Sequence, residues 1–486
     1  LGTNSIKDTG YNVANSLRFN DGDSAYLNFT PSSNGSRRIF TISVWFKTST
    51  VAGGNNYIFS SGNYAGGDGF LQIKLSSSGR LTIDDYDQGN DSYNVRWVSP
   101  SGGPLIKDPS AWYHLVFAVD STQGTQSNRA KAYLNGVDIS SKFTQTTNPS
   151  ENDDFHINTS SKVQQIGRSQ NDNNYYDGYL AEYVVVDGSQ LAPTSFGEFD
   201  EDSGIWKPIN VSGLTFGTNG FYLEFKQSGT SQNSSGLGAD TSGNDHHYAV
   251  NNLTAIDQSI DTCTNNFCTW NALEYSGDTA LAEGNTEGYT RDGVADYHEG
   301  ARGTIAVSNG KWYWEVKMVE VGDTSNAVFA GIMSADHQFR NGEEDELLLG
   351  TYGMRNDGNS VISNGSALAY ATYGASFSDG DILNFALDMD NNRLYIGKGG
   401  SWADGSGNID ESSINSFLSL STTPSAYMPM VIGYSTGADV KYQANFGSPP
   451  YAISSGNTDA EGFGNFEYAV PSSYFALCTK NLAEYG

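Results

Sequence analysis

Cysteine and proline are scarce in this chain, and charged side chains are fewer than in most soluble proteins. Its 486 residues include 12 prolines and three cysteines, Cys263, Cys268 and Cys478, and charged residues make up 17%. An odd and sparse set of cysteines excludes a disulfide framework. Cys263 and Cys268 are close enough in sequence to pair, and the sequence leaves open whether they do.

Long apolar runs are also missing. No run approaches the roughly 20 apolar residues that cross a bilayer, so we expect no membrane insertion. The chain does not open with a basic segment and an apolar core, so we expect no signal peptide. Leu1 is not an initiator Met, which indicates a processed chain or numbering that begins inside a longer product. Whether the chain continues before Leu1 or after Gly486 stays open.

The sequence has no basic stripe, and its net charge is −29. Because nucleic-acid phosphates attract Lys and Arg, nucleic acid is not an expected partner, and a membrane surface is not expected for the same reason. The excess of carboxylates favours solubility or the uptake of a divalent cation. We therefore expect no cofactor, although a structural calcium ion stays open and its ligands are unknown.

Catalytic motifs are absent too. The sequence has no G-x-S-x-G, Walker A loop, zinc-type Cys/His cluster or dinucleotide fingerprint. Glu198, Asp200 and Asp202 alternate as a pair of glycosidase carboxylates on a strand would, but they lie between two prolines and are expected to form a solvated acidic connector. His114 lies on an apolar strand and is expected to be a satisfied core or interface histidine. We predict no catalytic residues and no enzyme.

What the chain has in abundance is glycine and aromatic residues. It contains 56 Gly, and 13% of its residues are aromatic. Many short strands joined by Gly, Asn and Ser turns fit this composition, whereas a helical bundle does not. The length is too great for one ordinary core, so two or three domains are expected.

The most regular stretch is residues 380–400. Leu383, Phe385 and Leu387 alternate with polar or small residues, which is the period of a strand with one buried face. Asp390–Asn392 form a turn, because Asx side chains bond nearby backbone and tolerate left-handed dihedral angles. The stretch predicts a β-hairpin with one dry face and one wet face, which needs a second sheet to cover the dry face.

About a dozen such strands lie before residue 190, without helices between them, and this pattern predicts a two-sheet sandwich. The clearest are Phe70–Leu75, Arg80–Ile83, Trp112–Val119 and Gly178–Val186.

Four motifs in this region resemble the laminin-G-like, concanavalin-A-type jelly roll. They are Trp112-Tyr-His-Leu-Val, Tyr133-Leu-Asn-Gly, Ile166-Gly-Arg and Asp177-Gly-Tyr-Leu-Ala-Glu-Tyr-Val, in the order and at the spacing of that family. The resemblance covers residues 15–190 and implies a sandwich fold. Ala181 stands where an Asp is common, while Glu182 is kept, which weakens the case for a metal or ligand site on this strand.

Five motifs in the later part resemble the SPRY domain. They are G-K-W-Y-W-E-V from Gly310, A-G-I from Ala330, G-D-I-L-N-F-A-L-D from Gly380, M-P-M-V from Met428 and A-N-F-G-S-P-P-Y from Ala444. The resemblance covers residues 300–450. It implies a second, curved sandwich that acts as a protein-interaction module and not as an enzyme.

We therefore predict an all-β protein with two jelly-roll-type β-sandwiches in tandem, joined by a structured connector. The predicted parts are an N-terminal arm (1–15), the laminin-G-like sandwich (16–190), the connector (191–262), the SPRY-like sandwich (263–450) and a C-terminal tail (451–486) that docks on the second sandwich or on a neighbouring subunit.

Two polar loops that carry aromatic residues are the candidate ligand sites. Sugar binding uses an aromatic ring that stacks on C–H faces, with amide or carboxylate oxygens that accept from hydroxyl groups. The alternative is that the aromatic residues pack on their own domain or on a partner subunit. The candidate residues are Asp172, Tyr175, Tyr176 and Asp177 in the first loop, and Trp402 and Asp404 in the second.

Segments outside these motifs resemble tail and fibre proteins of marine bacteriophages, which also join a laminin-G-like domain to a SPRY-like one. They are residues 196–208, 238–244, 250–253 and 474–482. The resemblance implies a virion structural protein, such as a tail fibre, a spike or a capsid-surface fibre, on the virion exterior. Its expected partners are other virion proteins, further copies of itself, and a host-surface glycan or receptor.

Two other functions stay open. The first is a bacterial surface adhesin or appendage subunit, which would be extracellular or at the cell surface. The second is a glycan-cleaving enzyme on the same fold. The sequence does not identify the ligand, the host, a tail or capsid location, or the oligomeric number.

Overall fold

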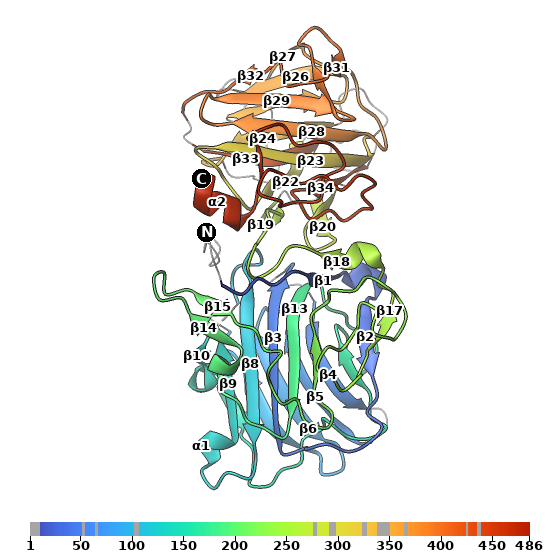
Figure 1. Cartoon of the computed structure of the whole chain (residues 1–486), viewed down its shortest axis with the longest axis vertical. Helices are drawn as coiled ribbons and strands as arrows, with labels where there is room; N and C mark the ends of the chain where they lie inside the picture. The colour runs from blue at the N-terminus through green and yellow to red at the C-terminus, as the bar shows by residue number, and fades with distance from the viewer. Residues whose placement is uncertain are drawn as a thin grey trace. The chain divides into compact units, whose positions relative to one another are not determined.

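A computed structural model describes residues 10–50, 54–63, 67–101, 106–275, 279–290, 298–322, 328–337, 350–363, 368–423, 426–434 and 439–486. Over these ranges strands are the main regular structure, and they are joined by turns and irregular segments (Figure 1). The two α-helices, α1 (Gln126–Arg129) and α2 (Thr479–Tyr485), are short, and no helix in the described ranges has the length and apolar character to cross a membrane. The all-β prediction is confirmed.

The described residues form two compact units, and the division falls between Asn266 and Phe267. We call them the first unit and the second unit. The first unit contains two eight-stranded sheets and a small two-stranded one.

Sheet A of the first unit runs in the order β10 (Val137–Asp138), β9 (Ala130–Leu134), β8 (Tyr113–Asp120), β3 (Ile39–Thr48), β13 (Gly178–Asp187), β1 (Ser16–Phe19) and β18 (Gln258–Ser259), with β16 (Phe221–Leu223) also paired to β13. Sheet B runs in the order β11 (Thr144–Thr147), β7 (Ser92–Val98), β6 (Leu81–Asp87), β5 (Gly69–Leu75), β4 (Asn56–Asn63), β12 (Gln164–Ile166), β2 (Tyr26–Phe29) and β17 (Ala249–Asn251). The short pair is β14 (Gly197–Phe199) with β15 (Trp206–Pro208). Four 3-10 turns complete the unit: η1 (Asp21–Asp23), η2 (Ser140–Lys142), η3 (Pro193–Ser195) and η4 (Ala255–Asp257).

The first core lies between sheets A and B, because alternate side chains of each strand point inward. Burial of these apolar side chains is the main force that holds the two sheets together. The core includes Leu17, Phe19, Ile42, Val44, Phe46, Leu71, Ile73, Leu81, Ile83, Leu115, Phe117, Leu180 and Tyr183.

Residues 191–262, predicted as a structured connector, fold as part of the first unit. They supply strands β16, β17 and β18 to its two sheets. Phe196, Phe216 and Tyr222 pack with Val116 and Val184 in a second apolar cluster. The aromatic side chains of this segment thus find the cover that their size requires.

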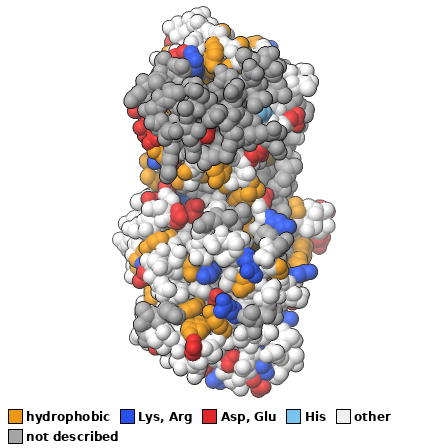
Figure 2. Space-filling view, turned by 180° about the vertical axis from the view of Figure 1, so that it is seen from behind, with side chains coloured by type: hydrophobic (Ala, Val, Ile, Leu, Met, Phe, Trp, Pro, Cys, Tyr) orange, Lys and Arg blue, Asp and Glu red, His pale blue; other side chains and the backbone are white. Residues whose placement is uncertain are grey.

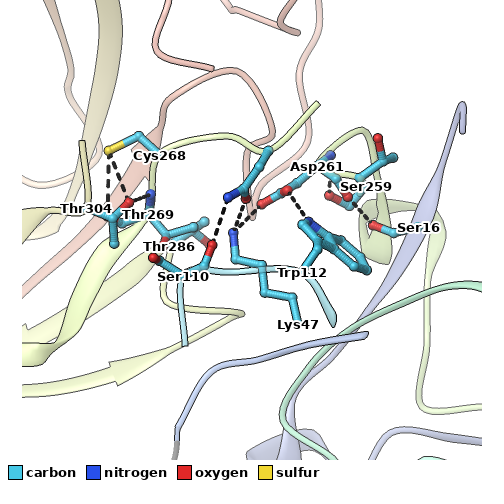
Figure 3. A network of polar contacts seen from close by, with 12 residues as sticks. Ser16, Lys47, Ser110, Trp112, Ser259, Asp261, Cys268, Thr269, Thr286 and Thr304 are labelled. Atoms are coloured by element: carbon cyan, nitrogen blue, oxygen red, sulfur yellow. Dashed lines mark hydrogen bonds and ion pairs between the residues drawn. The ribbon is translucent and has the colours of Figure 1, made fainter. Parts of the chain in front are cut away.

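A buried ion pair fixes the last part of the first unit (Figure 3). Lys47 Nζ lies 2.8 Å from Asp261 Oδ2 and donates to Asn266 Oδ1, also at 2.8 Å. Trp112 Nε1 donates to Asp261 Oδ1 at 3.1 Å. The Lys47 and Asp261 side chains are 2% and 1% exposed, so the charge of each is balanced inside the protein and not by water. We call this arrangement the Asp261 anchor.

The second unit also contains two large sheets. Sheet C runs in the order β19 (Trp270–Tyr275), β22 (His298–Gly303), β33 (Tyr427–Tyr434), β24 (Val328–Ser334), β25 (Thr351–Arg355), β26 (Asn359–Ser363) and β27 (Ala369–Thr372). Sheet D runs in the order β20 (Thr279–Ala282), β21 (Glu287–Thr290), β34 (Val440–Asn445), β23 (Lys311–Glu320), β28 (Ile382–Asp388), β29 (Arg393–Lys398), β30 (Ser401–Ala403) and β31 (Ile409–Glu411), with β32 (Leu418–Ser419) paired to β29 and β35 (Phe475–Ala476) to β23.

The predicted hairpin forms strands β28 and β29, and Leu383, Phe385 and Leu387 are fully buried in the second core. The prediction of a wet opposite face was wrong, because Asn384 and Ala386 are also 0% exposed. Ala386 lies beside Tyr313 on the neighbouring strand, and the ring of Phe466 packs 5.0 Å from that of Tyr313. The C-terminal segment therefore covers the face that the sequence pattern assigns to solvent.

Residues 451–486 lie in the second unit, where Glu315 holds part of them. This carboxylate accepts from the backbone N–H groups of Glu467 at 3.0 Å and Tyr468 at 2.8 Å. It also accepts from the Tyr313 hydroxyl and from Asn445 Nδ2, both at 3.0 Å. Burial raises the pKa of Glu315 to about 7, although all four hydrogen bonds lower it. We call this arrangement the Glu315 anchor.

Candidate functional site

A row of polar side chains crosses the outer face of sheet B. Successive cross-strand partners place these residues side by side on six neighbouring strands. Leu71, Ile73 and Ile83 of the same strands point into the core, so the row points away from it. The row, in spatial order, is Asn28, Gln165, Ser60, Gln72, Asp84 and Arg96.

The middle of the row contains two buried oxygen atoms that lack a partner. Gln72 and Asp84 are 5% and 6% exposed, and Gln72 Nε2 donates to Asp84 Oδ2 at 3.0 Å. Gln72 Oε1 and Asp84 Oδ1 accept no hydrogen bond from the part of the chain that the structure describes. Burial raises the pKa of Asp84, against the lowering effect of Gln72 and of the nearby Lys74 and Arg96 charges. Unpaired buried acceptors are costly, so these two atoms favour a hydrogen-bond donor. Neighbouring side chains cover both atoms, so the hydroxyl group of a ligand reaches them only when those side chains move aside.

Three aromatic rings, from Phe70, Tyr86 and Tyr93, line one side of the row. The rings of Phe70 and Tyr86 lie 5.6 Å apart, and those of Tyr86 and Tyr93 lie 4.8 Å apart. The Arg96 guanidinium lies 4.5 Å from the centre of the Tyr93 ring. Tyr86 and Tyr93 are half-buried, so part of each ring stays accessible.

On the other side, Lys74 Nζ lies 4.9 Å from the centre of the Tyr57 ring and donates to the Tyr57 hydroxyl at 3.1 Å. The first unit thus presents cationic groups among aromatic ones, although the chain as a whole is acidic. Figure 2 shows Lys and Arg side chains interspersed with hydrophobic ones over the first unit, seen from behind.

The first predicted loop packs on one end of the row. Ser60 Oγ donates to the Arg168 carbonyl at 2.8 Å, and the Arg168 guanidinium lies 3.5 Å from the centre of the Tyr26 ring. The same guanidinium pairs with Asp172 at 3.0 Å. The rings of Tyr26 and Tyr175 lie 6.3 Å apart. Asp172 and Tyr175 therefore belong to an aromatic and charged cluster that adjoins the polar row.

The structure corrects the prediction for Tyr176, the next residue in this loop. Tyr176 is 0% exposed, its ring packs in the core beside Phe19, and its hydroxyl donates to the Lys47 carbonyl at 3.0 Å. Asp177 is half-buried, and its carbonyl accepts from the Ser49 N–H at 3.0 Å. Of the four predicted residues in this loop, Asp172 and Tyr175 are the ones that join the cluster beside the row.

The second predicted loop belongs to the second unit. Trp402 is 5% exposed and packs edge-on against Tyr313, so its ring face is not available to a ligand and that prediction is corrected. Asp404 accepts from Asn408 Nδ2 and from the backbone N–H groups of Ser406 and Asn408, and these hydrogen bonds lower its pKa. Asp404 thus stabilises a turn.

Sequence reasoning missed the central residues of the row. The sequence assigns Gln72 to the predicted strand Phe70–Leu75 without a function, and Asp84 follows the predicted strand Arg80–Ile83 and is not singled out. The signal for Gln72 is the alternation itself, because Gln72 and Lys74 alternate with the apolar residues Leu71, Ile73 and Leu75 of their strand.

Two other buried titratable groups, His114 and Glu182, have hydrogen-bond partners within the first unit. His114 is a satisfied core histidine, as predicted: Nδ1 accepts from Trp206 Nε1 at 2.9 Å, the Ser43 hydroxyl lies 2.8 Å from Nε2, and burial lowers its pKa to about 3. Glu182, at a bulge in β13 with φ 48°, accepts from Tyr222 and Tyr11, and burial raises its pKa to about 7.

The site shows neither a metal cluster nor a facing pair of carboxylates. Within the described ranges, no group of three or more His, Cys, Asp or Glu could hold a metal ion. Asp84 has Gln72 and Arg96 as its cross-strand neighbours, and the adjacent Asp85 points to the opposite face. All three cysteines are buried thiols.

Residues 21–192 match the family model described as the concanavalin A-like lectin/glucanases superfamily. The SPRY domain of human HERC1 aligns at 16% identity with 36% of this chain and 96% of that one, with a TM-score of 0.28. Domains LG4-5 of the mouse laminin alpha1 chain align at 11% identity with 90% of this chain and 88% of that one, also with a TM-score of 0.28. The heptameric SAP-like pentraxin from Limulus polyphemus aligns at 16% identity with 37% of this chain and 80% of that one, with a TM-score of 0.26. No curated protein sequence matches the chain.

Proposed function

We propose that the first unit is a carbohydrate-binding domain and that the outer face of sheet B binds the glycan. The observation that carries this proposal is the polar row itself, in which the acceptors Gln72 Oε1 and Asp84 Oδ1 lie between a line of three aromatic rings and the Tyr57 ring. Sugars need this combination, because their hydroxyl groups donate to such acceptors while their C–H faces pack on rings. The match of residues 21–192 to a superfamily described by lectins and glucanases supports the same class of ligand.

Binding without cleavage is the better-supported activity. A retaining glycosidase needs two carboxyl groups about 5 Å apart, and an inverting one needs them about 6.5–9.5 Å apart. The cross-strand neighbours of Asp84 are an amide and a guanidinium instead. The raised pKa of Asp84 favours a glycan-cleaving enzyme, since a general acid must hold its proton, and the matched superfamily includes glucanases.

At the level of the whole chain, we propose a structural protein of the virion exterior, such as a bacteriophage tail fibre, spike or capsid-surface fibre. The resemblance of residues 196–208, 238–244, 250–253 and 474–482 to marine phage proteins supports it. In this proposal the first unit binds a host-surface glycan, and the SPRY-like second unit contacts other virion proteins or further copies of the chain. A bacterial surface adhesin is the alternative.

The test measures binding of the full chain to a panel of polysaccharides by isothermal titration calorimetry. We expect Asp84→Asn and Tyr93→Ala each to weaken binding about tenfold, which corresponds to about 1.4 kcal/mol. Asp202→Asn is the matched control, because Asp202 is exposed and lies in the turn between β14 and β15. Unchanged affinity in both test variants, or no binding by the unmodified chain to any glycan, would contradict the proposal.

The same incubations decide between binding and cleavage. We expect no new reducing ends from any polysaccharide. Release of reducing ends that stops in Asp84→Asn would instead establish the glycan-cleaving enzyme.

A further inference from the structure

A separate polar pocket of 260 Å³ lies in the first unit, at one end of strands β4, β5 and β6. Its volume is below the usual range for drug-sized ligands and suits a single sugar unit. Gly62 and Gly69 form part of its wall. The charged and polar side chains that line it are Arg37, Asp68, Asp87, His156, Thr159 and Lys162.

His156 is held in a fixed orientation by a buried carboxylate. Its Nδ1 lies 3.0 Å from Asp85 Oδ1, and its backbone N–H donates to Asp85 Oδ2 at 2.8 Å. Asp85 is 0% exposed. The second ring nitrogen, Nε2, adjoins Gly69, where an added Cβ would lie 2.5 Å from it. A glycine at this position keeps the space beside Nε2 open.

Two further cations share the pocket with His156. Arg37 Nε donates to the Phe155 carbonyl at 2.8 Å and Nη2 donates to the Asp154 carbonyl at 3.4 Å, so neutral acceptors orient the guanidinium. The Asp154 carboxylate lies 3.9 Å from Nη1. Lys162 pairs with Asp68, and their side chains are 33% and 45% exposed. An exposed ion pair contributes little stability, so a ligand can exchange for Asp68 at low cost.

The two lining carboxylates are engaged by the protein. Asp68 contacts Lys162, as described above. Asp87 accepts from Asn90 Nδ2 at 2.7 Å and from the Asn90 N–H at 3.2 Å. Arg37, His156 and Lys162 thus face the same space, and Asp68 is the one of the two acids that a ligand anion must displace, from Lys162.

We propose that this pocket binds the anionic substituent of an acidic sugar, a carboxylate or a sulfate ester, through His156, Arg37 and Lys162. The inference rests on the proposed function and specifies its ligand as an acidic glycan. Charge-assisted hydrogen bonds from three cations to one anion account for the selectivity over neutral sugars.

The protonation of His156 makes this recognition depend on pH. Burial lowers the pKa of His156, but the hydrogen bond and charge of Asp85 outweigh that effect, so the pKa is raised above 6.5. The charge of Arg37 lowers it and that of Asp87 raises it. Asp68 and Lys162 face the same pocket and offset each other in charge. Because the protonated ring is the form that attracts an anion, affinity falls as pH rises through this pKa.

The test uses three small probes with the full chain: galacturonate, galactose 6-sulfate and neutral galactose. Calorimetry at about pH 6 is expected to show at least tenfold tighter binding of one or both acidic sugars than of galactose. His156→Gln and Lys162→Gln should remove most of that preference. Lys142→Gln is the matched control for charge, because Lys142 is exposed and does not line the pocket. At about pH 8.5 the preference should shrink in the unmodified chain and stay constant in His156→Gln.

The outcomes separate this inference from the proposed function. Equal affinity for acidic and neutral sugars, or a preference that survives both test variants, overturns the pocket assignment. If Asp84→Asn still weakens binding of a neutral polysaccharide, the proposed glycan face stands without the pocket. Lys162→Gln changes a side chain that is only half-buried, so it keeps the test valid if His156→Gln fails to fold.

Discussion

The two units both bury a carboxylate to hold a segment far along the chain, but they balance its charge in different ways. In the first unit, Asp261 meets the ammonium group of Lys47 at 2.8 Å. In the second unit, Glu315 meets four hydrogen-bond donors that carry no charge, two of them backbone N–H groups. The Asp261 anchor is an ion pair, whereas the Glu315 anchor is a buried carboxylate surrounded by uncharged hydrogen-bond donors.

The difference shows what each anchor requires of the sequence. An ion pair depends on one distant side chain, so a single substitution leaves a bare charge behind. The Glu315 anchor distributes its hydrogen bonds over several donors, and the backbone donors among them cannot be removed by substitution. Because no cation balances the buried carboxylate in the Glu315 anchor, burial raises the pKa of Glu315 to about 7.

The largest effect is expected from removal of the cation. Lys47→Met leaves Asp261 buried and charged, so we expect the first unit to lose about 3–5 kcal/mol of unfolding free energy. Urea unfolding, followed by hydrogen exchange in first-unit peptides, measures the loss. Lys47→Met combined with Asp261→Asn should recover part of it.

Arg38→Met is the control for this experiment. Arg38 pairs with Asp154 at 2.7 Å, but both side chains are 45% exposed, so the expected loss is below about 1 kcal/mol. Equal losses in Lys47→Met and Arg38→Met would show that burial does not distinguish the two pairs.

A somewhat smaller effect is expected from removal of the acceptor in the second unit. Glu315→Leu leaves the Tyr313 hydroxyl, Asn445 Nδ2 and two backbone N–H groups without their acceptor, at a cost of about 2–4 kcal/mol. We also expect faster proteolysis between residues 451 and 470, because the anchor holds this segment. Glu320→Leu, at an exposed position on the same strand, should cost under about 0.5 kcal/mol. A protease-resistant segment in Glu315→Leu would disprove the anchor.

The smallest effect is a pH dependence of the second unit. The pKa of Glu315 is about 7 in the folded state against 4.5 ordinarily, so the folded state binds its proton more tightly. Protonation of Glu315 therefore adds to the free energy of unfolding below about pH 4.5, and this contribution is lost as pH rises through about 7. The contribution is at most about 3 kcal/mol. Unfolding free energies at about pH 5 and pH 8 should therefore differ more in the unmodified chain than in Glu315→Gln. A difference of the opposite sign would refute this account.

Local alternation was enough to predict much of the fold. The period of Leu383, Phe385 and Leu387 identified β28, and the Asn135-Gly136 turn joins β9 to β10 with φ values of 48° and 78°. Such features depend on residues a few positions apart, so a sequence pattern contains them.

The candidate site depends on contacts that local patterns do not contain. The polar row exists because Gln165 pairs with Ser60, which lies more than a hundred residues earlier. Tyr175 and Tyr176 have the same side chain, and only the path of the backbone buries the second. Strands β16 to β18 are two or three residues long, too short for a period to identify.

Strand β1 has a consequence for how the first unit acquires its structure during translation. Its partners are β13 and β18, and the Ser16 hydroxyl donates to the Asp261 carbonyl 245 residues away. A ribosome releases residues 16–19 long before those partners emerge from the exit tunnel. The first strand of sheet A is therefore made long before its neighbours, and it pairs only late in synthesis, which exposes its edge in the nascent chain.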